Sequence, residues 1–194
     1  MTETPSRPRL LLLDRDGVLN YEAPSGFVLE AEQWRWQSGL PAVLVPLSTL
    51  GIAVCVVTNQ SCVGRGLMTW EALDRVHARM RDEAAAVGVT FAAVYACPHA
   101  PDEGCACRKP RPGLLLTALA EQGVAPGETV MVGDATTDLE AARAAGLRCW
   151  LVRTGKGRRT EEELQARGDH SVPIFDTLHE VLAELARLPA PNEL

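Results

Sequence analysis

The sequence lacks any apolar run long enough to cross a membrane, and its first residues, 1–9, are mostly polar. A transmembrane helix needs about 20 consecutive apolar residues, and a secretory signal needs an apolar core near the N-terminus. We therefore expect a cytoplasmic protein that does not bind membranes. Internal repeats and low-complexity segments are also missing, and 194 residues suit one domain, so we expect a single domain spanning residues 1–194.

An excess of positive charge is lacking too, because the formal net charge is −6 at pH 7. Proteins that bind nucleic acid usually carry a basic surface, so we expect no nucleic-acid partner. Lysine is scarce: of the 19 basic residues only Lys109 and Lys156 are lysine. Both lysines lie in segments that we connect with phosphate binding below.

The sequence does contain a regular alternation of apolar strands and amphipathic helices. Apolar runs predict strands at 10–13, 52–57, 91–96, 129–134, 148–152 and 172–175. Helical spacing, caps and turn residues predict helices at 40–50, 70–87 and 112–119, between 134 and 146, from 160 onward, and at 176–188. This alternation predicts an α/β fold, with a parallel sheet and helices on both of its faces. Ligands of such sheets bind beyond the carboxyl ends of the strands.

Polar side chains follow three of these predicted strands. Asp14 and Asp16 follow the first strand, Thr58 and Asn59 end the second, and Asp134 ends the fourth. Because the carboxyl ends of parallel strands meet at one edge, we expect these side chains to face one site. Converging carboxylates need a cation, and Mg²⁺ prefers oxygen ligands. We therefore predict a Mg²⁺ site formed by Asp14, Asp16 and Asp134.

The residue types at this edge suit phosphoryl transfer. Asp14 is the candidate nucleophile, because a carboxylate can form an aspartyl-phosphate, and Asp16 is the candidate general acid and base. The pair 58–59 offers groups that hold phosphoryl oxygens, and Lys109 offers positive charge. Asp138 is placed to orient Lys109 or a metal-bound water. Each residue also has an ordinary explanation as a turn, a cap or a solvated charge, and only their joint occurrence favours a catalytic site.

Cysteine and histidine cluster in one irregular segment, which contains Cys97, His99, Cys105 and Cys107. Three thiolates and an imidazole are a ligand set of structural zinc, and a cytosolic setting favours metal binding over disulfides. The alternative is a set of buried cysteines, but the segment has little apolar core to bury them. We predict a small Zn²⁺-binding loop, inserted at 97–107, that places Arg108 beside the active site.

Four segments resemble, in their order, the four motifs of the haloacid dehalogenase-like phosphatase superfamily: DRDGVLN, TNQS, CRKP and VGDATTD. The resemblance implies a Rossmann-like doubly wound core, Mg²⁺ dependence and an aspartyl-phosphate intermediate. Asp14 would be the nucleophile and Asp16 the acid and base, with Lys109 as a further catalytic residue. Mg²⁺ would be held by Asp14, the backbone carbonyl of Asp16, and Asp134. The chain leaves little room for a large cap domain.

The cysteine cluster narrows the resemblance to the branch that contains the heptose-1,7-bisphosphate 7-phosphatases and the histidinol-phosphatase domain. The segments CRKPRPG and LVRTGKG are more similar to the heptose enzymes. The resemblance thus implies an enzyme that removes the 7-phosphate of D-glycero-D-manno-heptose 1,7-bisphosphate, and we expect this enzyme to be a monomer. Its place would be in lipopolysaccharide or nucleotide-activated heptose synthesis.

A sugar with two phosphates needs two anion sites. Thr58, Asn59 and Lys109 are candidates for the transferred phosphate. Arg65, Arg108 and the loop that contains Arg153 are candidates for the distal one, since arginine pairs with phosphate in a bidentate manner.

Other functions are compatible with parts of this pattern. A phosphatase for histidinol phosphate or another small phosphomonoester fits the short spacer between His99 and Cys105. A phospho-receiver domain also uses a parallel sheet and an acceptor aspartate, but leaves Asp16 and the cysteine loop without a role. A catalytically silent, zinc-stabilised binding module leaves every catalytic position unexplained.

Overall fold

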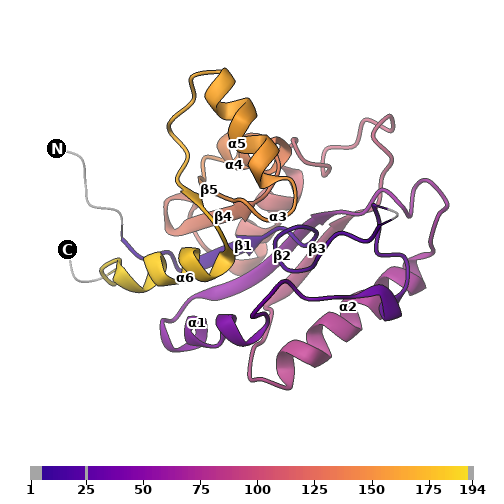
Figure 1. Cartoon of the computed structure of the whole chain (residues 1–194), viewed down its shortest axis with the longest axis horizontal. Coiled ribbons are helices and arrows are strands. Elements are labelled where there is room, and N and C mark those ends of the chain that lie inside the picture. The colour runs from indigo at the N-terminus through magenta and orange to yellow at the C-terminus, as the bar shows by residue number, and fades with distance from the viewer. Residues whose placement is uncertain (1–5, 25, 192–194) are drawn as a thin grey trace.

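The computed structural model describes residues 6–24 and 26–191, and within these residues six parallel strands form one sheet (Figure 1). The strands are β1 (Leu10–Leu13), β2 (Ala53–Asn59), β3 (Ala93–Cys97), β4 (Thr129–Gly133), β5 (Arg148–Val152) and β6 (Ile174–Phe175). Their order, β3-β2-β1-β4-β5-β6, is that of a Rossmann-like doubly wound sheet. The order reverses between β1 and β4, and the crevice at such a reversal is where ligands bind. All of the predicted strands are present.

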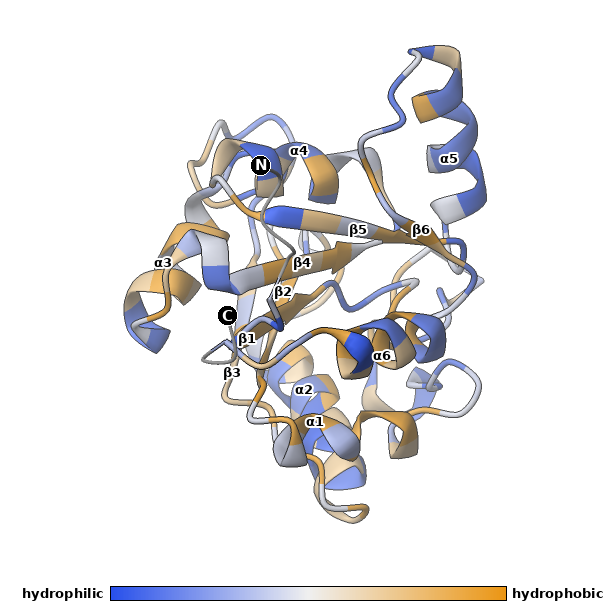
Figure 2. Ribbon diagram, turned by 90° about the vertical axis from the view of Figure 1, so that its left-hand side faces the viewer, coloured by the Kyte–Doolittle hydropathy of each residue, from blue (hydrophilic) through white to orange (hydrophobic). Residues whose placement is uncertain are grey.

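Helices cover both faces of the sheet, as predicted (Figure 2). One face is covered by α1 (Pro46–Thr49), α2 (Trp70–Ala85) and α6 (Leu178–Arg187), and the other by α3 (Gly113–Gln122), α4 (Thr136–Ala144) and α5 (Gly157–Ala166). Three 3₁₀ turns are found in the described residues: η1 (Ala31–Gln33), η2 (Ala42–Leu44) and η3 (Pro126–Glu128).

Strand β1 lies at the centre of the core. Leu11 and Leu13 pack toward α2 and α6, whereas Leu10 and Leu12 pack toward α3 and α4, and none of the four is exposed. A strand buried on both faces has no polar side to present, which explains the run of four leucines. The rigid packing of β1 fixes the position of Asp14, the residue that follows it.

Two helix predictions need correction. The predicted helix at 40–50 is instead the turn η2 followed by the short α1, because Pro41 and Pro46 lack the N–H that a continuous helix requires. The helix predicted from 160 onward begins three residues earlier, because α5 starts at Gly157 and Thr160 lies inside its first turn. Helix α2 begins at the predicted residue, and its N-cap is Thr69, whose hydroxyl accepts a hydrogen bond from the Ala72 N–H at 3.2 Å.

Aromatic residues of the segment between β1 and β2 pack against the core. Trp34 is buried, and its ring meets that of Trp36 edge to face at 5.0 Å. The Trp36 indole N–H donates to Glu83 of α2 at 2.7 Å. Among the described residues, the connections after β1 and β2 contain only short turns, α1 and α2, and no separate sheet. The carboxyl edge of the sheet is therefore open.

In the part of the chain that the structure describes, no helix is both long enough and apolar enough to span a membrane.

Candidate active site

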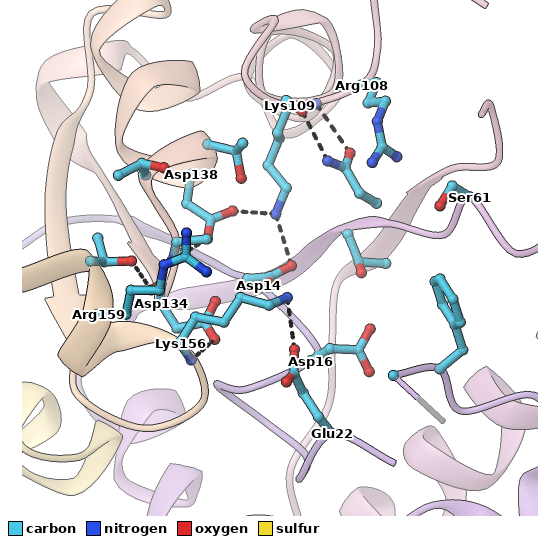
Figure 3. Close-up of a pocket in the computed structure, with 18 of the residues that line it drawn as sticks. Asp14, Asp16, Glu22, Ser61, Arg108, Lys109, Asp134, Asp138, Lys156 and Arg159 are labelled. Atoms are coloured by element: carbon cyan, nitrogen blue, oxygen red, sulfur yellow. Dashed lines mark hydrogen bonds and ion pairs between the residues drawn. The ribbon is translucent and has the colours of Figure 1, made fainter. Parts of the chain in front are cut away.

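A pocket of about 450 Å³ lies at the carboxyl edge of the sheet, over the reversal between β1 and β4 (Figure 3). Eight of the nine residues predicted for catalysis, phosphate binding and the Mg²⁺ site line it, together with Asp138: Asp14, Asp16, Thr58, Asn59, Arg65, Arg108, Lys109 and Asp134. These residues come from segments far apart in the sequence, and the parallel sheet brings their loops to one edge.

Lys109 is the centre of the pocket's floor. Its ammonium donates to Asp14 Oδ1 at 2.8 Å and to the Val57 carbonyl at 2.8 Å, and it lies 2.5 Å from Asp138 Oδ1. The three N–H bonds of the ammonium thus each have an acceptor. Burial by itself would lower the pKa of Lys109, but the charges of Asp138 and Asp14 outweigh it and raise this pKa. Lys109 therefore stays charged, and Asp138 orients it.

Three buried carboxylates surround this one ammonium. Asp14, Asp134 and Asp138 offer oxygen atoms that all lie within 4.8 Å of one another. Burial raises the pKa of Asp14 to about 6, against the lowering effect of Lys109. Burial and the charges of Asp14 and Asp138 raise the pKa of Asp134 to about 8. The excess of negative charge and the oxygen donors match what Mg²⁺ requires, so the residues fit the predicted ion.

Two glycines make room for the carboxylate of Asp134. Gly17 has φ +88° and Gly155 has φ +56°, and a Cβ at either position would lie 2.0 Å from Asp134 Oδ2. The same oxygen accepts a hydrogen bond from the backbone N–H of Lys156 at 2.8 Å. The hydroxyl of Thr160 donates to the Asp134 carbonyl at 2.8 Å. The loops after β1 and β5 therefore close directly on this carboxylate.

The carboxylate of Asp16 is held by other partners. Arg15 Nη2 donates to both of its oxygens at 2.9 and 3.0 Å, Asn20 Nδ2 donates to Oδ1 at 2.9 Å, and Gln60 Nε2 donates to Oδ2 at 2.7 Å. Burial alone would raise the pKa of Asp16, but the charge of Arg15 and these hydrogen bonds lower it. Asp16 is therefore ionised in the free protein and fixed in orientation.

Sequence reasoning did not identify the partners of Arg15. The guanidinium of Arg15 is completely buried, and its Nη1 lies 3.2 Å from Nε2 of His77 on α2. Because a guanidinium can only donate, His77 Nε2 must accept, and the imidazole is neutral. Burial and the charges of Arg15 and Arg81 lower the pKa of His77 to about 3, against a smaller raising effect of Asp16. The only signal in the sequence was the arginine between two motif aspartates.

We expect His77 to make the protein sensitive to acid. The pKa of His77 is about 3 in the folded protein and 6.5 ordinarily, so below pH 6.5 the unfolded state takes up more protons. Above pH 6.5 the neutral imidazole costs the folded protein nothing. As the pH falls from 6.5 toward 3, the free energy of unfolding decreases, and this decrease is about 2 kcal/mol at pH 5. Urea unfolding of the wild type and of His77→Gln at pH 7.5 and 5 measures this. An equal loss in both proteins would contradict it.

Asn59 has a different task from the predicted one. Its Nδ2 donates to the Lys109 carbonyl at 3.0 Å, and its Oδ1 accepts from the Lys109 N–H at 3.1 Å. The side-chain amide thus clamps the main chain of the central lysine instead of being free for phosphoryl oxygens. Thr58 is buried, and its hydroxyl accepts from Gln60 Nε2 at 2.9 Å.

Cations also line the outer part of the pocket. Within the described residues, neither Arg65 nor Arg108 forms an ion pair with a carboxylate. Arg108 Nη1 donates weakly to the His99 carbonyl at 3.4 Å, and the Arg65 guanidinium lies 5.9 Å from the centroid of the Phe27 ring. Lys156, in contrast, forms an ion pair with Glu22 at 2.7 Å. The two arginines are therefore better placed to receive an anion.

Arg153 is not among the residues that line the pocket, which corrects its predicted position. Its guanidinium forms two hydrogen bonds with Glu161, at 2.6 and 2.7 Å, and a third with Asp176 at 2.8 Å. These carboxylates satisfy the side chain and hold it against α5. Arg159, which the sequence did not single out, lines the pocket instead and pairs with Glu163 at 3.0 Å.

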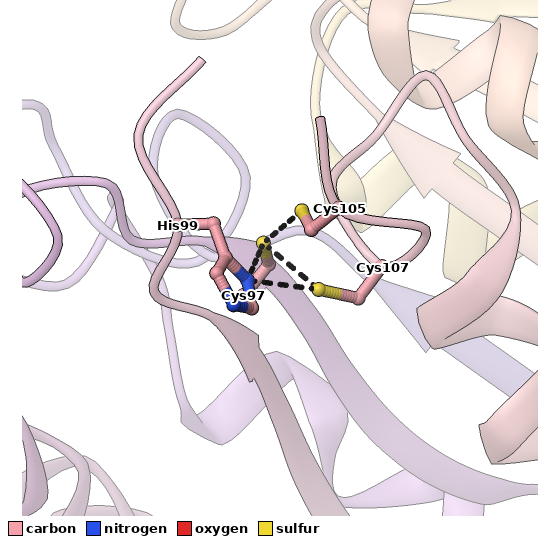
Figure 4. A group of neighbouring side chains, drawn as sticks. All are labelled: Cys97, His99, Cys105 and Cys107. Atoms are coloured by element: carbon pink, nitrogen blue, oxygen red, sulfur yellow. Dashed lines mark hydrogen bonds between the residues drawn. The ribbon is translucent and has the colours of Figure 1, made fainter. Parts of the chain in front are cut away.

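The predicted zinc ligands converge beside the pocket (Figure 4). Among Cys97 Sγ, His99 Nδ1, Cys105 Sγ and Cys107 Sγ, the recorded separations are 3.2 to 3.6 Å, and none of the cysteines forms a disulfide. A tetrahedron of bonds of about 2.3 Å to a central Zn²⁺ has edges of about 3.8 Å. The donor set and its spacing therefore fit a closed structural zinc site.

Comparisons with known proteins agree with this geometry. A family profile described as HAD-hydrolase-like matches residues 106–181. A D-glycero-β-D-manno-heptose-1,7-bisphosphate 7-phosphatase of Pseudomonas putida is 43% identical over 178 residues, which cover 91% of this chain and 99% of the relative. The enzyme of the same name from Pseudomonas aeruginosa is 39% identical, over 91% of this chain and 97% of the relative.

A solved structure is similar over nearly the same extent. The D,D-heptose 1,7-bisphosphate phosphatase of Bordetella bronchiseptica, in complex with magnesium and phosphate, superposes with a TM-score of 0.84 at 36% identity. The match covers 91% of this chain and 97% of that one. The chain therefore belongs to the haloacid dehalogenase-like hydrolases and, within them, to the family of D-glycero-β-D-manno-heptose-1,7-bisphosphate 7-phosphatases.

Proposed function

We propose that this protein is a Mg²⁺-dependent phosphatase that removes the 7-phosphate of D-glycero-D-manno-heptose 1,7-bisphosphate. The observation that carries the proposal is the coexistence of two anion sites in one pocket. Lys109, which lies beside Asp14, supplies the positive charge of one of them, and the arginines Arg65 and Arg108 supply that of the other. The names of the relatives supply the sugar. Histidinol phosphate carries one phosphate and would leave the second site without an occupant.

The first step transfers the phosphoryl group to the protein. Asp14 Oδ1 is held by Lys109, so Oδ2 attacks phosphorus, and the bond between phosphorus and the sugar oxygen breaks. Asp16 donates a proton to the departing oxygen, which leaves as an alcohol. The negative charge of a bound phosphate raises the pKa of Asp16 and so lets it carry that proton.

The second step returns the protein to its starting state. Asp16, now a carboxylate, takes a proton from water as the water oxygen attacks phosphorus. The bond between phosphorus and Asp14 breaks, and inorganic phosphate leaves. The positive charge of Lys109 stabilises the phosphoryl oxygens during both steps, and the Thr58 hydroxyl donates to one of them. Asp14, Asp134 and the carbonyl of Asp16 would hold Mg²⁺, which supplies positive charge against the phosphoryl oxygens.

A comparison of substrates tests the proposal. We expect the highest kcat/KM with heptose 1,7-bisphosphate, and lower values with heptose 7-phosphate, histidinol phosphate and hexose phosphates.

Arg108→Met should lower kcat/KM for the bisphosphate about tenfold or more, because one charge-assisted contact is lost, and should change the value for the 7-phosphate little. Phosphate release provides the measurement. A preference for histidinol phosphate would favour the alternative phosphatase, and a long-lived aspartyl-phosphate would favour the receiver domain.

The cysteine cluster binds one Zn²⁺ per chain in this proposal. Cys107 lies two residues before Lys109, and the Asn59 side chain holds the main chain of Lys109 to the end of β2. Loss of zinc should therefore disturb the position of Lys109 and of its neighbour Arg108. Cys107→Ser should contain less than a tenth of the wild-type zinc, melt at a lower temperature and show a raised KM. Elemental analysis and thermal unfolding measure this, with Cys149→Ser as the matched control. Zinc-free wild-type protein that is fully active would contradict the proposal.

The setting of the enzyme is part of the proposal. The protein acts as a cytoplasmic monomer on a small phosphorylated metabolite, and its product enters lipopolysaccharide or nucleotide-activated heptose synthesis. Light scattering during size-exclusion chromatography determines the oligomeric state. A dimer at micromolar concentration would overturn that element of the proposal without affecting the reaction.

A further inference from the structure

We propose that His77 is a positioning residue for acid–base catalysis, acting through Arg15 on the carboxylate of Asp16. The inference rests on the proposed role of Asp16 and extends the catalytic machinery to a residue of α2, behind the pocket. His77 does not line the pocket and touches no substrate position.

The three side chains form a chain of contacts, and two of them, Arg15 and His77, are buried. His77 Nε2 lies 3.2 Å from Arg15 Nη1, and Arg15 Nη2 donates to the two oxygens of Asp16 at 2.9 and 3.0 Å. Arg15 is 0% exposed and His77 is 5% exposed, so water cannot easily replace either contact. The chain of contacts connects a helix on one face of the sheet with the reacting edge.

Arg15 has no surplus of partners. Its Nε has no hydrogen-bond partner in the described residues, and its Nη2 is shared between Asp16 and the Gln60 Oε1 at 3.0 Å. The Nη1 group donates to His77 Nε2. A buried N–H without an acceptor is costly, so removal of His77 would drive the guanidinium to turn toward Asp16 or Gln60.

A turn of this guanidinium changes the direction of the Asp16 oxygens. Proton transfer requires the donor oxygen within hydrogen-bond reach of the atom that receives the proton, so a small displacement lowers the rate. The neutral imidazole is suited to this task because it accepts from a cation without repelling it. Glutamine offers an amide oxygen that can accept from Arg15 in the same way, whereas leucine cannot.

A comparison of kcat/KM for two leaving groups distinguishes a positioning role of His77 from a general loss of structure. The value of kcat/KM reports the steps up to departure of the alcohol, and an alkyl alcohol needs the proton from Asp16 whereas p-nitrophenolate does not. We expect His77→Leu to lower kcat/KM for heptose 1,7-bisphosphate about tenfold, and to change kcat/KM for p-nitrophenyl phosphate less than twofold. His77→Gln should restore the bisphosphate value to within twofold of the wild type.

Met80→Leu is the matched control, because Met80 is a buried α2 residue about one turn after His77 and the change conserves volume. Met80→Leu should leave kcat/KM unchanged for both substrates. If His77→Leu does not fold, His77→Ala takes its place. Equal losses with both substrates, or no rescue by His77→Gln, would overturn the inference. A wild type that does not hydrolyse the bisphosphate would instead overturn the proposed function, so the two failures are distinguishable.

Discussion

Asp14→Asn should lower kcat for phosphate release by about 10⁴-fold or more while leaving the fold intact. An amide has no carboxylate oxygen with which to attack phosphorus, yet it has nearly the same shape, and its carbonyl oxygen can still accept from Lys109. Removing one charge from three crowded carboxylates also relieves repulsion, so we expect the thermal stability of the metal-free variant to be at least that of the wild type. Phosphate release and thermal unfolding measure both effects.

Asp74→Asn provides the control for this experiment, because Asp74 is an exposed residue of α2. It should keep the wild-type rate. Detection of a phosphorylated wild-type protein by rapid acid quench, and its absence in Asp14→Asn, would place the phosphoryl group on the expected residue. An Asp14→Asn protein with more than about a hundredth of wild-type kcat would contradict the role of this carboxylate.

Lys109→Met should destabilise the metal-free protein by about 3 to 5 kcal/mol, in addition to abolishing activity. Lys109 is 2% exposed and is the ammonium that contacts Asp14 and Asp138, so its removal leaves buried carboxylates without compensation. Urea unfolding in the presence of EDTA measures the loss. The deficit should shrink as the pH falls from 8 to 5.5, because the pKa of Asp14 is already about 6 and loss of Lys109 raises it, so the Asp14 carboxylate takes up a proton.

The double variant Lys109→Met with Asp138→Asn tests the cause of this deficit. If unpaired charge is responsible, removal of one carboxylate should recover a substantial part of the lost stability. If lost packing is responsible, the second substitution should add to the damage. A single variant Lys109→Met as stable as the wild type at pH 8 would contradict the account of the buried ion pairs.

The position of Lys109 connects the two proposed metal sites. The cysteine cluster ends two residues before it, Asn59 clamps its main chain, and its ammonium lies among the carboxylates. In the proposed function, zinc would hold the loop that places the Lys109 ammonium among these carboxylates. These contacts explain how an irregular segment with little apolar core can hold a lysine in one orientation.

The sequence alone determined the strands, their parallel arrangement and the edge at which the site lies. Apolar runs and helical spacing are local properties, and the geometry of alternating strands and helices then forces Asp14, Thr58 and Asp134 to one edge. The convergence of Cys97, His99, Cys105 and Cys107 was also predictable, because all four lie within one short segment. Membership of the family followed from four motifs in order.

Only the tertiary structure decided which partner each polar side chain takes. Arg153 was predicted to reach the pocket, but it pairs with Glu161 and Asp176. Asn59 holds the main chain of Lys109, and His77 contacts Arg15 from a helix on one face of the sheet. A polar side chain can reach several partners of equal chemistry, and the packing of segments distant in sequence selects among them.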